Sequence, residues 1–274
     1  MSDGLPPTTD TDFAIQTSDL GVRYSLRFSR KKSMQGTLSQ LLTGQPAEQF
    51  WALRHVGLRV VHGESLAVIG PNGAGKSTLL QVLAGIISPS EGVVDVRGHV
   101  SALLTLGAGF DVELTGRENI LLAGAFLGLD DGVTRRLLPG IVEFADLGQF
   151  IDAPLKTYSA GMRARLGFAI ATSVDPDVLL LDEVLATGDA TFRAKSKARV
   201  LELVEEAKAI VLVTHDMGWV KEYCNRAVLI EAGRVVIEGE PDEVVERHRR
   251  NTEEAKRRKE EEARAAGLAP VIAR

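Results

Sequence analysis

The sequence has very little cysteine, since Cys224 is the single one among 274 residues. No disulfide can therefore form within one copy of the chain, which excludes a disulfide-stapled fold and favours a reducing compartment. We expect Cys224 to be a small buried hydrophobic residue.

Long apolar runs are missing as well. The longest, Ile120 to Leu129, is interrupted by Gly124 and Gly128, whereas a membrane-spanning helix needs about 20 apolar residues. We therefore expect a chain that does not cross a bilayer alone. Residues 1–12 are polar and acidic, without the basic start and apolar stretch of a signal peptide, and predict a flexible tail.

An excess of positive charge is also absent. The chain has 32 Lys and Arg residues and 37 Asp and Glu residues, which gives a net charge of −5. We therefore expect no nucleic-acid partner that binds through overall charge. The sequence has no Asn-Lys-x-Asp motif of the kind that reads guanine, which favours adenine over guanine as the base of any bound nucleotide.

Apolar strand-like segments alternate with helical patterns, which predicts an α/β fold with a largely parallel sheet. The early strands and a hairpin around Ala232 and Gly233 predict a smaller antiparallel part. We expect a tail over 1–12, a domain over 13–245 with an insert at 25–50, and a charged helix and tail over 246–274. Predicted strands are 13–24, 50–61, 65–69, 93–106 broken at Gly98, 177–181, 210–213, 227–230 and 234–237; predicted helices are 76–83, 117–128, 133–145, 161–173, 192–207 and one from Pro241.

A glycine-rich segment between a strand and a helix matches the G-x-x-x-x-G-K-[ST] pattern of phosphate-binding loops. Glycines let successive backbone N–H groups point at one anion, and the following helix N-terminus adds a favourable dipole. We expect Lys76 to contact the β- and γ-phosphates of ATP and Ser77 to bind Mg²⁺. The segment consists of Gly70, Pro71, Asn72, Gly73, Ala74, Gly75, Lys76, Ser77 and Thr78.

Two carboxylates, Asp182 and Glu183, follow a buried apolar strand. Ligands bind beyond the carboxyl ends of parallel strands, so Asp182 is predicted to hold Mg²⁺ and Glu183 to orient and deprotonate an attacking water. The pattern alone would suit a strand that ends in a polar turn. It favours catalysis only together with the phosphate-binding loop.

Two further residues are candidates for the same site. His215 follows the apolar strand at 210–213 and is predicted to contact the γ-phosphate, although a histidine satisfied in a turn is the alternative. Tyr24 either stacks on adenine or is a core aromatic, and the residues alone favour neither. Phe50 and Trp51 are predicted to be core residues rather than site residues.

The segment Tyr158-Ser159-Ala160-Gly161-Met162-Arg163, between the phosphate-binding loop and Asp182-Glu183, resembles the signature motif of ATP-binding cassette (ABC) ATPases. The resemblance covers roughly residues 13 to 245. It implies a P-loop NTPase fold with a RecA-like parallel sheet core, an antiparallel β subdomain and an α-helical signature subdomain.

That family also implies a homodimer in which two copies face each other head to tail around two ATP molecules. Ser159, Ala160 and Gly161 of one copy would then bind the γ-phosphate held by the other copy's loop, as an anion at a helix N-terminus. Asp189 would lie at the dimer seam. The implied cofactors are ATP and Mg²⁺.

Segments 50–56, 106–110 and 114–119 resemble one subgroup, the ATPase subunits of bacterial polysaccharide exporters for O-antigen, teichoic acid and actinobacterial lipid-linked galactan. The long insert between Tyr24 and Trp51 resembles that subgroup too. Residues 25–32 and 214–217 look closest to the galactan exporters. The resemblance implies an ATPase at the cytoplasmic face of the cell membrane. Two copies of a membrane-spanning subunit would be its partners and would handle the lipid-linked polysaccharide.

The sequence departs from the family pattern in three ways. Ala160 replaces a usual glycine of the signature, and we expect function to survive because alanine is tolerated at a helix start. No glutamine occurs between Gln81 and Gln149, where most cassettes have one that touches Mg²⁺ and reports to the membrane subunit; Thr105 and Leu106 occupy that region. The sequence offers no sugar-binding domain after the charged helix, so recognition is expected in the membrane partner or the lipid–sugar linkage.

The basic segment from Arg23 to Lys32 is either a solvated loop or a region close to anionic lipid headgroups. The tail from Glu246 to Arg264 mixes both charge signs at helical spacing and predicts a solvated helix with i,i+4 pairs. The functional alternative is a soluble cassette ATPase that acts in iron–sulfur assembly, on ribosomes or on DNA, or a cassette for another transported substrate.

Overall fold

The computed structural model describes residues 13–26, 48–103, 107, 109–182 and 189–265. Its centre is a six-stranded sheet with the strand order β5-β6-β7-β3-β8-β9, in which only the β8–β9 pair is antiparallel. The strands are β3 (Glu64–Ile69), β5 (Val100–Leu103), β6 (Val178–Asp182), β7 (Ala209–Val213), β8 (Arg226–Glu231) and β9 (Arg234–Gly239).

The apolar runs in β6 and β7 are buried on both faces, as strands of a covered parallel sheet must be. Alternate side chains feed two different cores. Leu180 and Val211 pack on the face that carries α2 (Lys76–Leu83), whereas Leu179 and Ile210 pack on the opposite face. That opposite face is covered by helices α6 (Ala190–Glu206), α7 (Met217–Tyr223) and the start of α8 (Pro241–Ala265).

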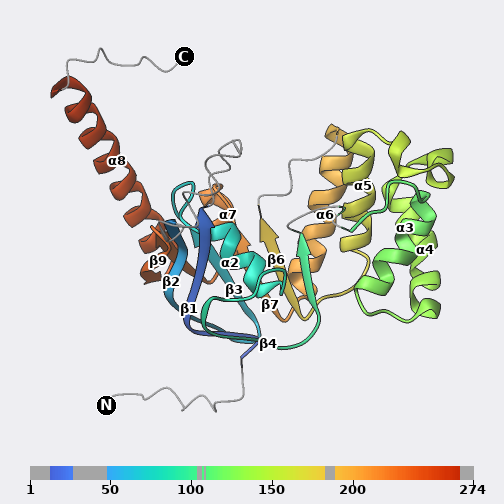
Figure 1. Ribbon diagram of the computed structural model, residues 1–274, viewed down its shortest axis with the longest axis horizontal. Coiled ribbons are helices and arrows are strands. Elements are labelled where there is room, and N and C mark those ends of the chain that lie inside the picture. The colour runs from blue at the N-terminus through green and yellow to red at the C-terminus, as the bar shows by residue number, and fades with distance from the viewer. Residues whose placement is uncertain (1–12, 27–47, 104–106, 108, 183–188, 266–274) are drawn as a thin grey trace, which may run out of the picture.

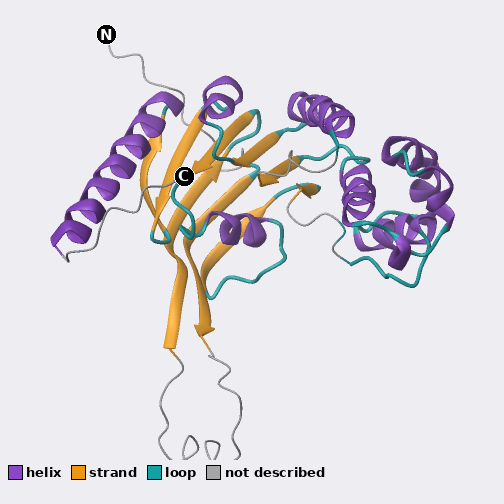
Figure 2. Cartoon of the chain, turned by 90° about the horizontal axis from the view of Figure 1, so that it is seen from above, coloured by secondary structure: helices purple, strands orange, loops and turns teal. Residues whose placement is uncertain are grey.

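A second, three-stranded antiparallel sheet has the order β2-β1-β4. One continuous core joins this sheet, α2 and the central sheet, with Leu79 and Leu80 of α2 fully buried within it. The far end of the β1–β2 ribbon extends away from the body (Figure 2). The strands are β1 (Ile15–Leu26), β2 (Glu48–Val60) and β4 (Glu91–Val96).

A helical unit lies beside the central sheet (Figure 1) and has its own core around Ile120, Leu155 and Leu166. Its first helix begins in a capping box, in which the Thr115 hydroxyl accepts from the Glu118 N–H and the Glu118 carboxylate accepts from the Thr115 N–H. The unit contains α3 (Gly116–Phe126), α4 (Asp131–Ala145), the 3₁₀ turns η1 (Gly148–Asp152) and η2 (Leu155–Thr157), and α5 (Ala160–Ala171).

The fold therefore confirms the predicted α/β class, with a parallel core, an antiparallel sheet and a helical unit. The β8–β9 hairpin is confirmed, and α2 has the predicted bounds. The sequence analysis missed α7 and the 3₁₀ turns. The boundary expected between residues 245 and 246 falls inside the continuous helix α8. Along the described ranges, no helix has the combination of length and apolar character that crossing a bilayer requires.

Candidate functional site

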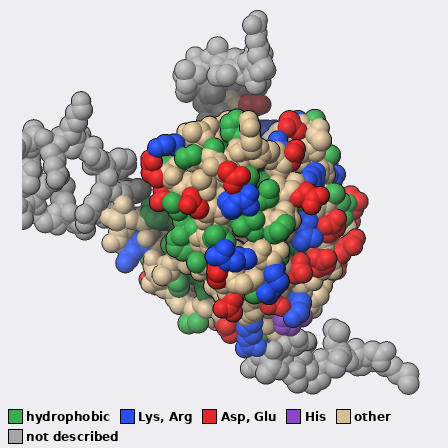
Figure 3. All heavy atoms as spheres, turned by 90° about the vertical axis from the view of Figure 1, so that its right-hand side faces the viewer, with side chains coloured by type: hydrophobic (Ala, Val, Ile, Leu, Met, Phe, Trp, Pro, Cys, Tyr) green, Lys and Arg blue, Asp and Glu red, His purple; other side chains and the backbone are tan. Residues whose placement is uncertain are grey.

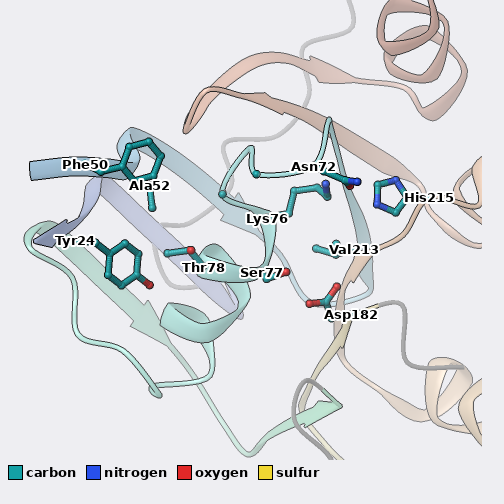
Figure 4. A pocket seen from close by; sticks show the side chains of 12 residues that line it. Tyr24, Phe50, Ala52, Asn72, Lys76, Ser77, Thr78, Asp182, Val213 and His215 are labelled. Atoms are coloured by element: carbon teal, nitrogen blue, oxygen red, sulfur yellow. The ribbon is translucent and has the colours of Figure 1, made fainter. Parts of the chain in front are cut away.

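A pocket of about 380 Å³ lies where the carboxyl ends of β3, β6 and β7 meet the β1–β2 ribbon (Figure 4). It brings together residues from five separate stretches of the chain, including most of the residues that the sequence predicted for one site. Its lining consists of Tyr24, Phe50, Ala52, Asn72, Gly73, Gly75, Lys76, Ser77, Thr78, Asp182, Val213 and His215.

The phosphate-binding loop, residues 70–78, needs its glycines at two close approaches. A Cβ atom on Gly70 would lie 2.1 Å from the Ile230 carbonyl oxygen, and one on Gly75 would lie 2.4 Å from the Ala52 carbonyl oxygen. Both residues also have positive φ. Gly75 is the N-cap of α2 and has no side chain to cap it, so the first-turn N–H groups are left for an anion.

Lys76 is held by its own loop. Its Nζ donates hydrogen bonds to the carbonyl oxygens of Gly70 at 2.8 Å and Pro71 at 3.0 Å, and the residue is only 7% exposed. These contacts fix the ammonium group at the mouth of the loop, beside Asn72 in Figure 4. A phosphate group there would neutralise a cation that is otherwise costly to bury.

Ser77 and Asp182 supply oxygen ligands on opposite walls of the pocket. In Figure 4 the Ser77 hydroxyl and the Asp182 carboxylate point toward each other, one from α2 and the other from the end of β6. Hydroxyl, carboxylate and phosphate oxygens are the ligands that Mg²⁺ prefers. This donor set fits the predicted metal.

Tyr24 and Phe50 line the end of the pocket that is farthest from Asp182 (Figure 4). They are register partners in the β1–β2 ladder, and they are 39% and 50% exposed. The prediction that Phe50 belongs to the core is wrong, because the β1–β2 ribbon projects beyond the sheets and leaves nothing to bury its end (Figure 2). Trp51, on the other face of the strand, is half-buried against Gly21, and the Arg23 and Arg54 guanidinium groups lie 5.4 and 5.3 Å from the centre of its ring.

His215 reaches the pocket from the turn after β7. The turn is fixed on both sides of the histidine. The Thr214 hydroxyl accepts from the Asp216 N–H at 3.0 Å, and the Asp216 carboxylate caps α7 by accepting from the Gly218 and Trp219 N–H groups. The imidazole is thereby carried by a rigid corner at the strand end.

The signature residues lie outside the lining of this pocket. Ser159 caps α5 by accepting from the Met162 N–H at 3.2 Å, and Ser159, Ala160 and Gly161 are exposed at that helix start. Asp189 likewise caps α6, accepting from the Phe192 N–H at 2.9 Å. That hydrogen bond holds the pKa of the exposed Asp189 below its ordinary value, with a smaller effect from Arg165, whose guanidinium lies 3.8 Å away.

Some predicted positions lie outside the described residues. They are Glu183, the Thr105-Leu106 segment, the tail over 1–12 and residues 27–47, which hold most of the insert and of its basic segment. The structure also adds pocket residues that the sequence analysis did not assign, Phe50, Ala52 and Val213. A possible clue was the alternation along β2, which puts Phe50 and Ala52 on one face. The sequence does not reveal that this face meets the loop.

Comparison with known proteins found a matching family model and several similar proteins. The family model for ABC transporters matches residues 53–186. An O-antigen export system ATP-binding protein, RfbB of Klebsiella pneumoniae, is 43% identical over 207 residues, which cover 76% of this chain and 83% of that protein. RfbB of Myxococcus xanthus is 46% identical over 198 residues, covering 72% of this chain and 45% of the relative.

A third relative is the teichoic acids export ATP-binding protein TagH of Lactococcus lactis, 43% identical over 198 residues, which cover 72% of this chain and 42% of TagH. The chain thus spans less than half the length of the Myxococcus and Lactococcus relatives. Among solved structures, a dimeric ATP-binding cassette bound to ADP and phosphate superposes with a TM-score of 0.62 at 21% identity, over 83% of this chain and 98% of that one. This likeness concerns the fold.

Proposed function

This chain belongs to the family of ABC transporter ATPases, and we propose that it powers export of a lipid-linked polysaccharide across the cytoplasmic membrane. One observation carries the proposal. The chain aligns with 83% of an O-antigen export ATP-binding protein at 43% identity. Lys76, Ser77 and Asp182, three of the residues expected to bind ATP and Mg²⁺, line one pocket, which supports an ATPase role.

In this proposal the chemistry is charge placement around ATP. The loop N–H groups and the Lys76 ammonium bind the β- and γ-phosphates, and Tyr24 stacks on the adenine. Ser77 and Asp182 hold Mg²⁺, which neutralises charge on the phosphate oxygens when bound. Glu183 orients the attacking water and accepts its proton, while His215 contacts the γ-phosphate at the end of β7.

The site is completed by a second copy of the chain. Ser159, Ala160 and Gly161 are exposed at the start of α5 and lie outside the pocket lining of their own copy. A helix N-terminus of this kind attracts an anion, and a head-to-tail homodimer would supply it to the γ-phosphate in trans. Asp189 at the start of α6 would then lie at the seam. ATP binding closes the dimer, and hydrolysis opens it.

The partner of the dimer is a membrane-spanning subunit, present in two copies, at the cytoplasmic face of the membrane. The helical unit offers exposed large hydrophobic side chains to such a partner, and Figure 3 shows hydrophobic side chains among charged ones on that side of the molecule. The exposed hydrophobic residues of the unit are Val112, Phe126, Leu127 and Phe150. Phe126 is the most exposed of the four, at 70%.

The substrate that we propose is a lipid-linked galactan. The support is the likeness of residues 25–32 and 214–217 to galactan exporters, within a broader similarity to O-antigen and teichoic acid export proteins.

A trapped complex tests this function. Glu183→Gln should bind ATP without hydrolysing it and hold the closed dimer. We would tag this variant, solubilise membranes in mild detergent with ATP and Mg²⁺, and identify the proteins that co-purify. We expect a polytopic membrane protein to co-purify in equal amount. In a separate experiment, cells that lack the chain should accumulate a lipid-linked galactose polymer inside.

Two controls make this result interpretable. Lys76→Ala should recover less of the membrane protein, because it cannot close around ATP. Ribosomes, nucleic acid or iron–sulfur assembly proteins in place of a membrane subunit would overturn the exporter proposal and favour a soluble cassette. Accumulation of a polymer without galactose would reject galactan alone.

A further inference from the structure

Helix α8 docks on the body through one narrow face. Its inward positions recur every three or four residues, and Val244 among them is fully buried. The other side chains of α8 that the structure describes, up to residue 261, are exposed and mostly charged, and the far end of the helix leaves the body in Figure 1. The inward residues are Pro241, Val244, Val245, His248 and Asn251.

The last of these residues makes a specific polar contact. Asn251 Nδ2 donates a hydrogen bond of 2.8 Å to Glu231 Oε1, the carboxylate at the end of β8. Both residues are half-buried, so the bond is only partly screened by water and counts for more than an exposed pair. It is a polar tie between the middle of α8 and the end of β8, beside the apolar packing of Val244 and Val245 on the hairpin.

The turn of the β8–β9 hairpin is hydrogen-bonded to the phosphate-binding loop. The Gly233 N–H donates to the Ala74 carbonyl oxygen at 3.0 Å, and the Gly233 carbonyl oxygen accepts from the Arg54 N–H at 2.8 Å. At the start of the loop, Gly70 lies so close to the Ile230 carbonyl that only glycine fits. The loop is therefore braced by the hairpin at two points.

His248, one turn before Asn251, lies on the same inward face of α8. Its Nδ1 atom is buried without a hydrogen-bond partner among the described residues. Burial lowers the pKa of His248, the charges of Lys76 and His215 lower it further, and Glu231 opposes them. The docked face of α8 is thus within electrostatic reach of two residues of the phosphate pocket.

From these contacts we propose that α8 positions the phosphate-binding loop through the Asn251–Glu231 hydrogen bond and the β8–β9 turn. Asn251 and Glu231 are positioning residues for ATP binding and touch no nucleotide themselves. Release of the α8 contact lets the turn shift, and the Ala74 and Gly70 backbone shifts with it. The exposed part of α8 then becomes a lever through which a partner could change the affinity for ATP.

An exchange of donor and acceptor tests the proposal. Asn251→Asp places two carboxylates at hydrogen-bond distance, and we expect it to raise the Kd for a fluorescent ATP analogue about tenfold, as contacting residues couple strongly. Glu231→Gln keeps an acceptor for Asn251 and should leave Kd within about twofold. Glu231→Gln combined with Asn251→Asp recreates the bond in reverse and should restore Kd.

Glu254→Gln, on the exposed part of the same helix, is the matched control and should leave Kd unchanged. The melting temperature is measured for every variant, and Asn251→Ser replaces Asn251→Asp if the latter does not fold. An Asn251→Asp or Asn251→Ser chain whose Kd stays at the wild-type value although its melting temperature falls would overturn the proposal, since α8 would then only stabilise the fold. A double variant that fails to recover ATP binding would overturn it as well.

Discussion

Tyr24 and Phe50 lie directly opposite each other in the antiparallel ladder of β1 and β2, and both line the nucleotide pocket. Opposed side chains in such a ladder stand on one face of the sheet about 5 Å apart. The ribbon therefore presents an aromatic wall that is wider than a single ring. Such a wall suits the flat face of a purine.

The first prediction concerns this wall. Phe50→Ala should raise the KM for ATP about fivefold and leave kcat nearly unchanged, because stacking of one aromatic ring on a base is worth roughly 1–3 kcal/mol. Tyr24→Ala should raise KM at least as much. Phe126→Ala removes a still more exposed ring that is outside the pocket lining, and it is the control. An unchanged KM in Phe50→Ala would remove this residue from the base site.

The second prediction concerns Lys76. Its ammonium is held between the carbonyl oxygens of Gly70 and Pro71, so removal takes away a fixed charge at the phosphates. Lys76→Ala should reduce ATP hydrolysis about 100-fold or more. Lys76→Arg should also fail, since the planar guanidinium does not fit a socket made for a compact ammonium.

Steady-state ATPase assays at saturating Mg²⁺ measure both Lys76 variants, with the melting temperature as a check on folding. Lys156→Ala removes an exposed lysine that pairs with Glu113 in the helical unit and should keep the isolated chain's activity. Normal hydrolysis by Lys76→Arg would show that charge alone suffices at this position.

The sequence predicted those parts of the site whose positions follow from a local sequence motif or from the ends of parallel strands. The strand, glycine loop and helix around Lys76 follow from one continuous motif. Asp182 and His215 join them because the carboxyl ends of parallel strands meet at one edge of a sheet. Phe50 was misplaced because its burial depends on how far the β1–β2 ribbon projects, which no local pattern encodes.

The docked face of α8 escaped sequence analysis for a related reason. Its inward residues, such as His248 and Asn251, have many charged neighbours in the sequence. The sequence pattern therefore predicts a helix that is solvated on all sides. The partner of Asn251 is Glu231, 20 residues earlier in the chain. That pairing comes from packing of α8 on the hairpin, which is set by tertiary contacts and not by helical periodicity.

The third prediction concerns the dependence of stability on pH. Asp177 accepts from Lys208 at 2.7 Å and from the His99 N–H at 2.7 Å, and these bonds lower its pKa below the ordinary 3.8. A carboxylate with a lowered pKa stabilises the fold above its ordinary pKa and loses that effect as the pH falls through the lower, folded value. Asp177→Asn should therefore cost about 1 kcal/mol of unfolding free energy near pH 7 and progressively less in acid.

Urea unfolding of the wild type and Asp177→Asn at several pH values measures this difference. Asp175→Asn is the control, because the Asp175 carboxylate is 77% exposed and pairs loosely with Arg199 at 3.5 Å. It should change stability little at any pH. A deficit in Asp177→Asn that stays constant down to acid pH would mean that packing, and not the carboxylate charge, accounts for it.

The fourth prediction concerns Cys224, which directly follows α7 and is 8% exposed. Burial raises the pKa of its thiol from 9.0 to about 12, so the folded chain holds about a thousandfold less thiolate than the unfolded one at neutral pH. Because only the thiolate reacts, a disulfide reagent should label the native chain far more slowly than the chain in denaturant. Since Cys224 is the single thiol, the residual rate reports how often the end of α7 opens. Labelling of the native chain at the unfolded rate would contradict this burial. Slower labelling with ATP present would show that nucleotide binding stabilises α7 and the turn before it, which carries His215.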